Sequence, residues 1–255
     1  PKQLRLAITI SVMAGRFPRP LIIIGMHRSG TSMLSHAFHL SGICMGIFQD
    51  HNHEAINFIH LNEKMLACGG GSWKSPLVPP ISCIPKVAPV DIYLDHLKIE
   101  GASSLRMRLF KYHSWGWKDP RTTFTLPVWL TMFPDAKVIH IVRNGWDVAQ
   151  SLRKRNSIPW EVPCPEANDV LWGFELWEKY VRQANTYHDL DIPFLEVRYE
   201  DILKGDTKTL QSLDDFSGAR VSRRLKVIRQ RPQTKEHANE VSEIESPWMR
   251  HWGYQ

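Results

Sequence analysis

The chain has 255 residues and a mass of 29.5 kDa, enough for one substantial core, and its 43% hydrophobic and 23% charged residues are ordinary for a globular protein. Its net charge of +6 favours anionic ligands, but the most basic segment, residues 220–231, interleaves cations with apolar residues as an amphipathic helix does, which argues against a nucleic-acid partner. No stretch reaches the roughly 20 apolar residues that a membrane span needs, since the run at residues 6–14 is too short, and this excludes a transmembrane segment in this chain.

Four strand-like segments, each followed by a helical pattern, alternate along the chain as in βα units. The first of them contains a continuous Leu-Ile-Ile-Ile run, whose apolar character on both faces is typical of a central parallel strand. The four strand–helix pairs are residues 20–26 with 31–40, 116–118 with 122–132, 136–142 with 145–155, and 193–198 with a helix that begins after the strand. The alternation predicts an α/β fold: a single-domain, three-layer, doubly wound parallel sheet with a P-loop-like phosphate-binding loop.

Local signals mark the ends of these elements. Asn144 is a suitable N-cap for the helix at 145–155, and Asp147 adds negative charge to its first turn. Two proline-rich segments, 72–89 and 157–165, interrupt the alternation. In a doubly wound sheet such loops lie at the carboxyl ends of the strands, where substrates bind.

The expected domain organisation is simple. No internal repeat or low-complexity tract divides the sequence, so we expect one domain over residues 1–255. Within it, residues 1–19 form an N-terminal extension, 20–205 the core, and 206–255 a C-terminal helical segment.

The four cysteines, Cys44, Cys68, Cys83 and Cys164, show neither CxxC pairing nor the spacing of zinc ligands. We therefore expect reduced thiols and no metal site. A Cys68–Cys83 disulfide is left open for the case that the chain is secretory.

Residues 25–32 have the spacing of a Walker A loop, G-x-x-x-x-G-K-[ST], except that Thr31 replaces the lysine. Glycines let backbone N–H groups surround an anion, and the helix that follows directs its positive end at it. Arg28 supplies a cation from inside the loop, where a nucleotide triphosphatase would use the lysine. The pattern predicts an anion-binding loop; an ordinary βα turn with two glycines is the alternative.

Two segments resemble the signatures of the sulfotransferases that use 3′-phosphoadenosine-5′-phosphosulfate (PAPS). Arg28-Ser29-Gly30-Thr31-Ser32 is similar to the family's [KR]-S-G-T-[TS] loop, which holds the 5′-phosphosulfate. Val142-Arg143-Asn144, followed by Ser151 and Arg155, is similar to the family's second signature. The resemblance implies that Arg143, Ser151 and Arg155 hold the 3′-phosphate. Independently, Ser151 and Arg155 are four residues apart and would share a helix face.

Two weaker matches lie in the same order along the chain. Residues 198–202 resemble a YED motif, which implies that Tyr199 contacts adenine, and Lys118 lies in a K-D-P segment where the family carries a lysine. The glycine-rich RKGxxG segment of the cytosolic small-molecule branch is missing, and Pro120 stands where that branch has a histidine base. The resemblance, which covers residues 20–205, is therefore nearer to the tyrosylprotein and bacterial sulfotransferases.

The resemblance implies in-line transfer of a sulfuryl group from PAPS to a hydroxyl or amine, with 3′,5′-ADP as the product and no metal. Arg28 and Lys118 would stabilise the charge on the leaving phosphate. Glu54 would be the general base, because bacterial relatives carry a glutamate in a similar segment; a solvated carboxylate at a helix start is the alternative. His51, His53 and His113 are other candidate bases.

Competing interpretations concern both the reaction and its acceptor. A P-loop kinase or NTPase with an altered Walker A loop is the alternative enzyme, and a nucleotide-binding scaffold without catalysis is the non-enzymatic one. The acceptor would be a small molecule, a glycan or a peptide tyrosine. Trp73, Trp115, Trp160 and Phe48 are candidates for lining its pocket or for the core.

Whether the chain forms a homodimer is left open. The expected location is the cytoplasm for a bacterial source, or the Golgi lumen if an N-terminal anchor has been removed.

Overall fold

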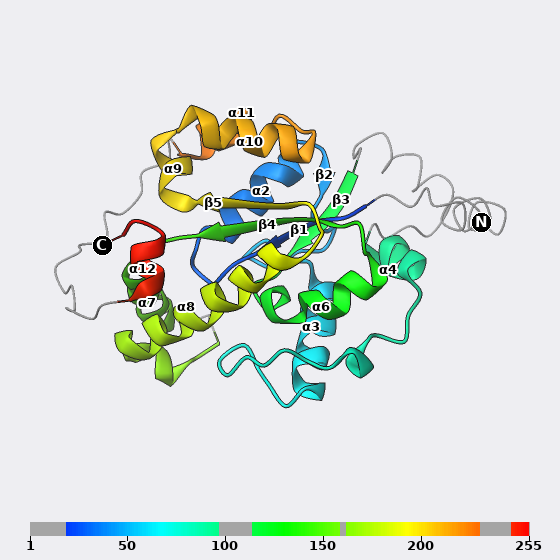
Figure 1. Ribbon diagram of the computed structural model, residues 1–255, viewed down its shortest axis with the longest axis horizontal. Helices are drawn as coiled ribbons and strands as arrows, with labels where there is room; N and C mark the ends of the chain where they lie inside the picture. Colours follow the sequence, from blue (N-terminus) through cyan, green and yellow to red (C-terminus); the bar gives the residue numbers. More distant parts are fainter. Residues whose placement is uncertain (1–18, 97–113, 159–161, 230–245, 255) are drawn as a thin grey trace.

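The computed structural model describes residues 19–96, 114–158, 162–229 and 246–254. In these residues five parallel strands form one sheet in the order β2-β3-β1-β4-β5 (Figure 1). In chain order the strands are β1 (Leu21–Ile24), β2 (Ile43–Cys44), β3 (Ser114–Lys118), β4 (Lys137–Val142) and β5 (Phe194–Arg198). The predicted α/β fold with a parallel sheet is thus confirmed.

Helices cover both faces of the sheet (Figure 1). One face carries α2 (Thr31–Leu40), α9 (Tyr199–Lys204), α10 (Thr207–Ser217) and α11 (Val221–Arg229). The other carries α3 (Ile56–Cys68), α4 (Pro89–His96), α6 (Thr122–Met132), α7 (Gly145–Asn156), α8 (Val170–Asn185) and α12 (Pro247–His251). Short 3₁₀ turns are η1 (Ile81–Cys83), η2 (Pro165–Asn168) and η3 (Thr186–Asp189), and the last two flank α8. The doubly wound, three-layer arrangement is therefore confirmed.

Strand β1 lies at the centre of the sheet because every side chain in it is apolar. Leu21 and Ile23 pack into the cluster below α2 and α11, while Ile22 and Ile24 pack into the cluster on the α6 side. All four are buried. Side chains of a strand alternate between its faces, and each full burial of an Ile contributes about 1.5–3 kcal/mol, so this run fixes β1 between two helical layers.

Aromatic rings fill the core between β3, α3 and α6. Phe58 stacks on Trp117 with ring centroids 4.0 Å apart, and Trp129 packs at 5.1 Å from both. Trp115, a candidate for the acceptor pocket, belongs to this cluster and is buried. Of the two alternatives left open for Trp115, the core is therefore the one observed, because β3 directs this side chain into it.

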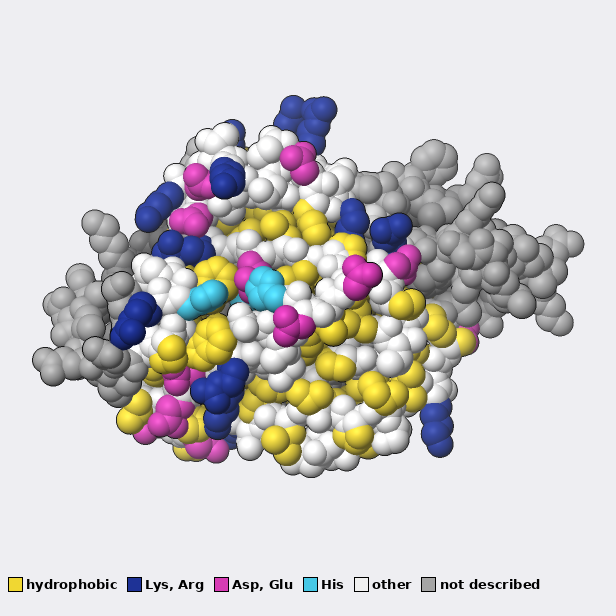
Figure 2. All heavy atoms as spheres, viewed as in Figure 1, with side chains coloured by type: hydrophobic (Ala, Val, Ile, Leu, Met, Phe, Trp, Pro, Cys, Tyr) yellow, Lys and Arg dark blue, Asp and Glu magenta, His cyan; other side chains and the backbone are white. Residues whose placement is uncertain are grey.

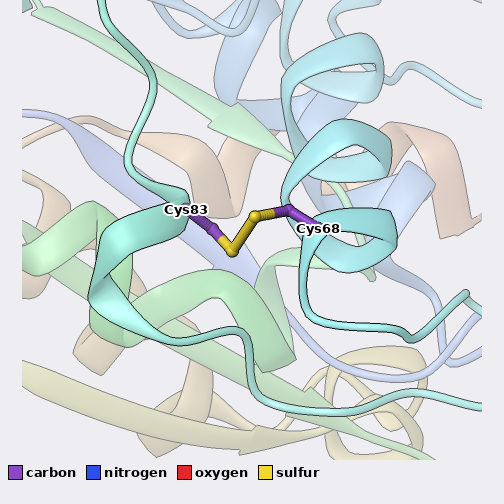
Figure 3. The surroundings of a disulfide bond; sticks show 2 residues. All are labelled: Cys68 and Cys83. Atoms are coloured by element: carbon purple, nitrogen blue, oxygen red, sulfur yellow. A yellow bond between two sulfur atoms is a disulfide. The ribbon is translucent and has the colours of Figure 1, made fainter.

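A disulfide joins Cys68, the last residue of α3, to Cys83 in η1 (Figure 3). The expectation of reduced thiols is thus wrong for this pair, and the alternative left open is the one observed. The Cα atoms lie 5.9 Å apart, within the range that a disulfide spans. Cys44 and Cys164 are free and buried.

The outer surface in the view of Figure 2 carries Lys and Arg side chains that are spread out rather than gathered in one patch. Exposed apolar side chains cluster in the proline-rich segment, at Leu77, Val78, Ile81 and Val87. Among the described helices, none is both long and apolar enough to cross a bilayer.

Candidate active site

A cavity of about 430 Å³ lies at the carboxyl ends of the central strands. Its walls come from the loop after β1, the ends of β3 and β4, the first turns of α2 and α9, and residues 50–54. Ligands of open parallel sheets bind at this edge. Every residue predicted for the site except Ser29 lines the cavity: Arg28, Gly30, Thr31, Ser32, Glu54, Lys118, Arg143, Ser151, Arg155 and Tyr199.

Ser29 differs from its neighbours in the loop. Its side chain is buried, and its Oγ has no hydrogen-bond partner among the described residues. Its backbone N–H donates to the carbonyl of Met26 at 3.2 Å. The backbone of Ser29 therefore supports the turn, and its predicted contact with a ligand stays a prediction.

The loop between β1 and α2 needs glycine at both ends. Gly25 has φ 138°, and a Cβ there would lie 2.4 Å from the carbonyl oxygen of Ile141. Gly30 has φ 92°, and a Cβ there would lie 2.3 Å from a ring carbon of Tyr199. Both positions thus exclude a side chain by conformation and by space.

The first turn of α2 is built to receive an anion. No side chain caps it, so its backbone N–H groups are left for an external acceptor at the positive end of the helix. Thr31 and Ser32 lie in this turn and line the cavity. The anion-binding loop predicted from the spacing therefore has the expected strand–loop–helix geometry.

Arg28 connects the loop to the second predicted group of residues. Its Nε donates to Ser151 Oγ at 3.1 Å, and its carbonyl accepts from Arg143 Nη1 at 3.2 Å. The Arg143 guanidinium also lies over the ring of Tyr199, 5.0 Å from the centroid. Segments that are more than 100 residues apart in the sequence thus meet in one cationic site.

Glu54, another residue that lines the cavity, accepts from two cations. Lys118 Nζ lies 2.8 Å from Oε1, and Arg121 Nη1 lies 3.2 Å from Oε2. Both Glu54 and Lys118 are buried, so the solvated carboxylate considered as an alternative is wrong. Burial opposes ionisation of Glu54, but Lys118, His27 and Arg121 together lower its pKa to about 2.

Lys118 also reaches the phosphate loop. Its Nζ lies 3.4 Å from Ser32 Oγ, so the same ammonium contacts both the cradle and Glu54. The β3 strand holds Lys118 in this place, because the residue is its last and the neighbouring β1 ends at the loop.

Arg121 and His27 are among the residues that line the cavity without having been predicted as site residues. Arg121 forms ion pairs with Asp119 at 2.9 Å and with Glu63 at 3.3 Å in addition to Glu54. His27 lies with its ring 5.0 Å from that of Trp73, and burial, reinforced by neighbouring cations, lowers its pKa to about 3. The sequence pointed to these two residues only by their positions, since Arg121 follows Lys118 by three residues and His27 directly precedes Arg28.

The remaining candidates are scattered. His51 lines the cavity, His53 instead packs on His36 with centroids 4.4 Å apart, and His113 lies outside the described residues. Trp73 lines the cavity, whereas Phe48 is 58% exposed and Trp160 lies outside the described residues. Among the described residues no three His, Cys, Asp or Glu side chains are grouped so as to hold a metal ion.

These features define a P-loop-like α/β protein with a cationic cavity. The model of the sulfotransferase family matches residues 82–223, more than half of the chain, so the protein belongs to the sulfotransferase family and is an enzyme of that class. The matched range begins after the phosphate loop. The assignment of that loop therefore depends on its own geometry, not on the match.

Solved structures similar to this chain have low identity. The sulfotransferase domain from the Curacin biosynthetic pathway shares 16% identity over 79% of this chain and 74% of its own, with a TM-score of 0.44. A sulfotransferase from Alicyclobacillus acidocaldarius shares 15% identity over 80% of this chain and 82% of its own, with a TM-score of 0.47. The sulfotransferase STF1 from Mycobacterium tuberculosis H37Rv shares 15% identity over 82% of this chain and 71% of its own, with a TM-score of 0.45. No curated protein matches the chain by sequence.

Proposed function

We propose that the enzyme transfers a sulfuryl group from PAPS to a hydroxyl or amine of an acceptor by in-line displacement. The observation that carries the proposal is the hydrogen bond from Arg28 to Ser151, which joins the phosphate loop to a second cationic site within one cavity. A ligand that fills both would carry an anion at each end, as PAPS does with its 5′-phosphosulfate and 3′-phosphate.

The residues present fit such a donor. The α2 N-terminus, with Gly30, Thr31 and Ser32, would bind the 5′-phosphosulfate, and Arg143, Ser151 and Arg155 would bind the 3′-phosphate. Tyr199 would contact the adenine, since its ring already lies against Gly30. All these residues extend from loops and helices of one sheet, which supports a single sulfotransferase domain.

Transfer would form a bond between the acceptor oxygen or nitrogen and sulfur, and break the bond between sulfur and the bridging oxygen. The bridging electrons remain on the phosphate of 3′,5′-ADP, where Arg28 and Lys118 would stabilise the developing charge. Glu54 would take the proton of the acceptor. When Lys118 turns from Glu54 toward the leaving phosphate, the carboxylate loses its nearest cation and becomes a stronger base.

The acceptor would enter beside Glu54, in the same cavity that His51, Trp73 and Val162 help to line. These residues do not select among a small molecule, a glycan and a peptide tyrosine. The Cys68–Cys83 disulfide favours an oxidising compartment, and so the Golgi lumen over the cytoplasm as the site of action.

The donor can be tested without knowing the acceptor. Thermal unfolding would be followed with 3′,5′-ADP, with 5′-AMP and with Mg-ATP. We expect 3′,5′-ADP to raise Tm without magnesium, as a ligand at about 100 times its Kd adds about 2.7 kcal/mol of stability. Stabilisation by Mg-ATP alone would instead favour the altered P-loop kinase or NTPase, and PAPS that binds but is never turned over with any acceptor would favour a scaffold.

A further inference from the structure

The C-terminal segment, residues 246–254, packs at the edge of the sheet where the proposed donor site lies. Its helix α12 lies beside α7 and α8 in Figure 1. Ser246 Oγ donates to Glu178 of α8 at 2.5 Å, and Met249 is buried. The ring of Trp252 meets His140 of β4 at 6.0 Å. This segment is thus held in a fixed place against the core.

The end of this segment contacts Glu200, the residue that follows Tyr199 in the sequence. Tyr254 donates its hydroxyl to Glu200 Oε2 at 2.7 Å, and its ring lies 4.7 Å below the guanidinium of Arg198. Burial and the nearby Glu200 carboxylate raise the pKa of Tyr254, so the phenol keeps its proton and remains a donor at neutral pH.

The other oxygen of Glu200 reaches the 3′-phosphate side. Oε1 accepts the backbone N–H of Asn144 at 3.0 Å. The Asn144 side chain in turn caps α7 by accepting from the backbone N–H groups of Trp146 and Asp147. Helix α7 carries Ser151 and Arg155, and Arg143 directly precedes Asn144.

Glu200 therefore joins three pieces of chain with its two oxygens. It follows Tyr199 at the start of α9, it fixes the start of α7 through Asn144, and it is itself fixed by Tyr254. Hydrogen bonds to a carboxylate are stronger than those between neutral groups. A shift at Glu200 would move the adenine contact and the 3′-phosphate contact relative to each other.

We infer that Glu200 and Tyr254 are positioning residues for the nucleotide donor, so that the C-terminal segment sets the spacing between the adenine and 3′-phosphate contacts. This inference rests on the proposed function. Neither residue lines the cavity, and each acts through residues that do.

The test is isothermal titration of the full chain with 3′,5′-ADP and with 5′-AMP, well below Tm. Tyr254→Phe keeps the ring that packs on Arg198 and removes only the hydroxyl. We expect Kd for 3′,5′-ADP to rise about tenfold, as loss of one hydrogen bond to a charged group allows. Kd for 5′-AMP should rise less, because that ligand makes no 3′-phosphate contact.

Two further variants separate positioning from stability. Ser246→Ala removes the link to Glu178 in the same segment and should leave Kd within twofold of the original, although Tm falls. Glu200→Gln can still accept from Asn144 and meet the Tyr254 hydroxyl, so it should bind 3′,5′-ADP more tightly than Glu200→Ala. A merely structural role would not produce this rescue.

The inference is overturned if Tyr254→Phe lowers Tm but binds 3′,5′-ADP as tightly as the unaltered chain. It is also overturned if Ser246→Ala weakens binding as much as Tyr254→Phe. Failure of the unaltered chain to bind 3′,5′-ADP would be a different result, because it removes the proposed function itself and this inference with it.

Discussion

The two sides of the cavity are built differently. On the proposed donor side, the contacts come from the short connections between a strand and the helix that follows it, as at Gly30 and at Asn144. On the side of Glu54, they come from residue 54 ahead of α3 and from the β3–α6 connection, and the chemistry arises from the ion pairs between these two segments. A short motif can therefore specify the first side, whereas only tertiary packing creates the second.

The largest expected effect comes from Arg28, whose side chain joins the loop after β1 to Ser151 of α7. Arg28→Ala removes a cation that we propose stabilises the leaving phosphate, and with it the hydrogen bond to Ser151. Release of 3′,5′-ADP from PAPS should slow about 10³-fold, comparable to loss of one strong transition-state donor. Arg224→Ala, an exposed change on α11, is the control and should leave the rate unaltered. An unchanged rate in Arg28→Ala would return the protein to the scaffold interpretation.

The ion pairs of Glu54 can be tested through the pH dependence of the free energy of unfolding. Glu54 has a pKa of about 2 in the fold against 4.5 ordinarily, so below pH 4.5 the unfolded chain binds more protons. The free energy of unfolding should fall as pH drops from about 4.5 through about 2, by about 3 kcal/mol from this residue.

Urea unfolding at several pH values measures this loss. Glu54→Gln should remove this pH-dependent loss of stability. It should also destabilise the fold at pH 7, because Lys118 would stay buried without its partner carboxylate. Glu63→Gln is the control, since that side chain is 53% exposed, and it should keep the acid-dependent loss. The same acid sensitivity in Glu54→Gln would contradict the ion-pair arrangement.

Binding at the proposed donor side can be tested by introducing a steric clash alone. Gly30→Ala would place a methyl group against Tyr199 and force a left-handed φ on alanine, so Kd for 3′,5′-ADP should rise about 30-fold, or about 2 kcal/mol. Gly70→Ala is matched in φ, at 76°, but its Cβ would meet nothing within 4 Å. It should lose a little stability and no affinity. Equal affinity loss in both variants would show that the clash with Tyr199 is unimportant.

The smallest effect is expected at the junction of the two proposed anion sites. Ser151→Ala removes the acceptor of the Arg28 Nε hydrogen bond, and Kd for 3′,5′-ADP should rise about tenfold, measured by calorimetry. Ser157→Ala, just beyond the end of the same helix, bonds only to the carbonyl of Lys154 and should bind normally. Tight binding by Ser151→Ala would separate the two sites.

The same contrast explains how much the sequence could predict. Helix α6 has the predicted bounds, and Asn144 caps α7 as expected, because both depend on local chemistry. Strand β2, with two residues, was missed since it is too short for a pattern. The extra 3₁₀ turns around α8 likewise have no distinct periodicity.

The Glu54 side was less predictable. Glu54 was selected by resemblance, but its burial between Lys118 and Arg121 depends on how α3 and α6 meet β3. Arg121 was missed for the same reason. The role of a cation three residues after Lys118 becomes apparent only when the fold brings Glu54 and Glu63 to it.

The disulfide at the end of α3 also bears on proteolysis. Cys68 and Cys83 close a covalent ring that contains Trp73, a wall of the cavity, and exposed residues such as Leu77 and Ile81. A protease that cut between the two cysteines would leave both fragments joined through sulfur. The clipped enzyme would run as one band until a reductant was added, and its cavity wall would stay attached to α3.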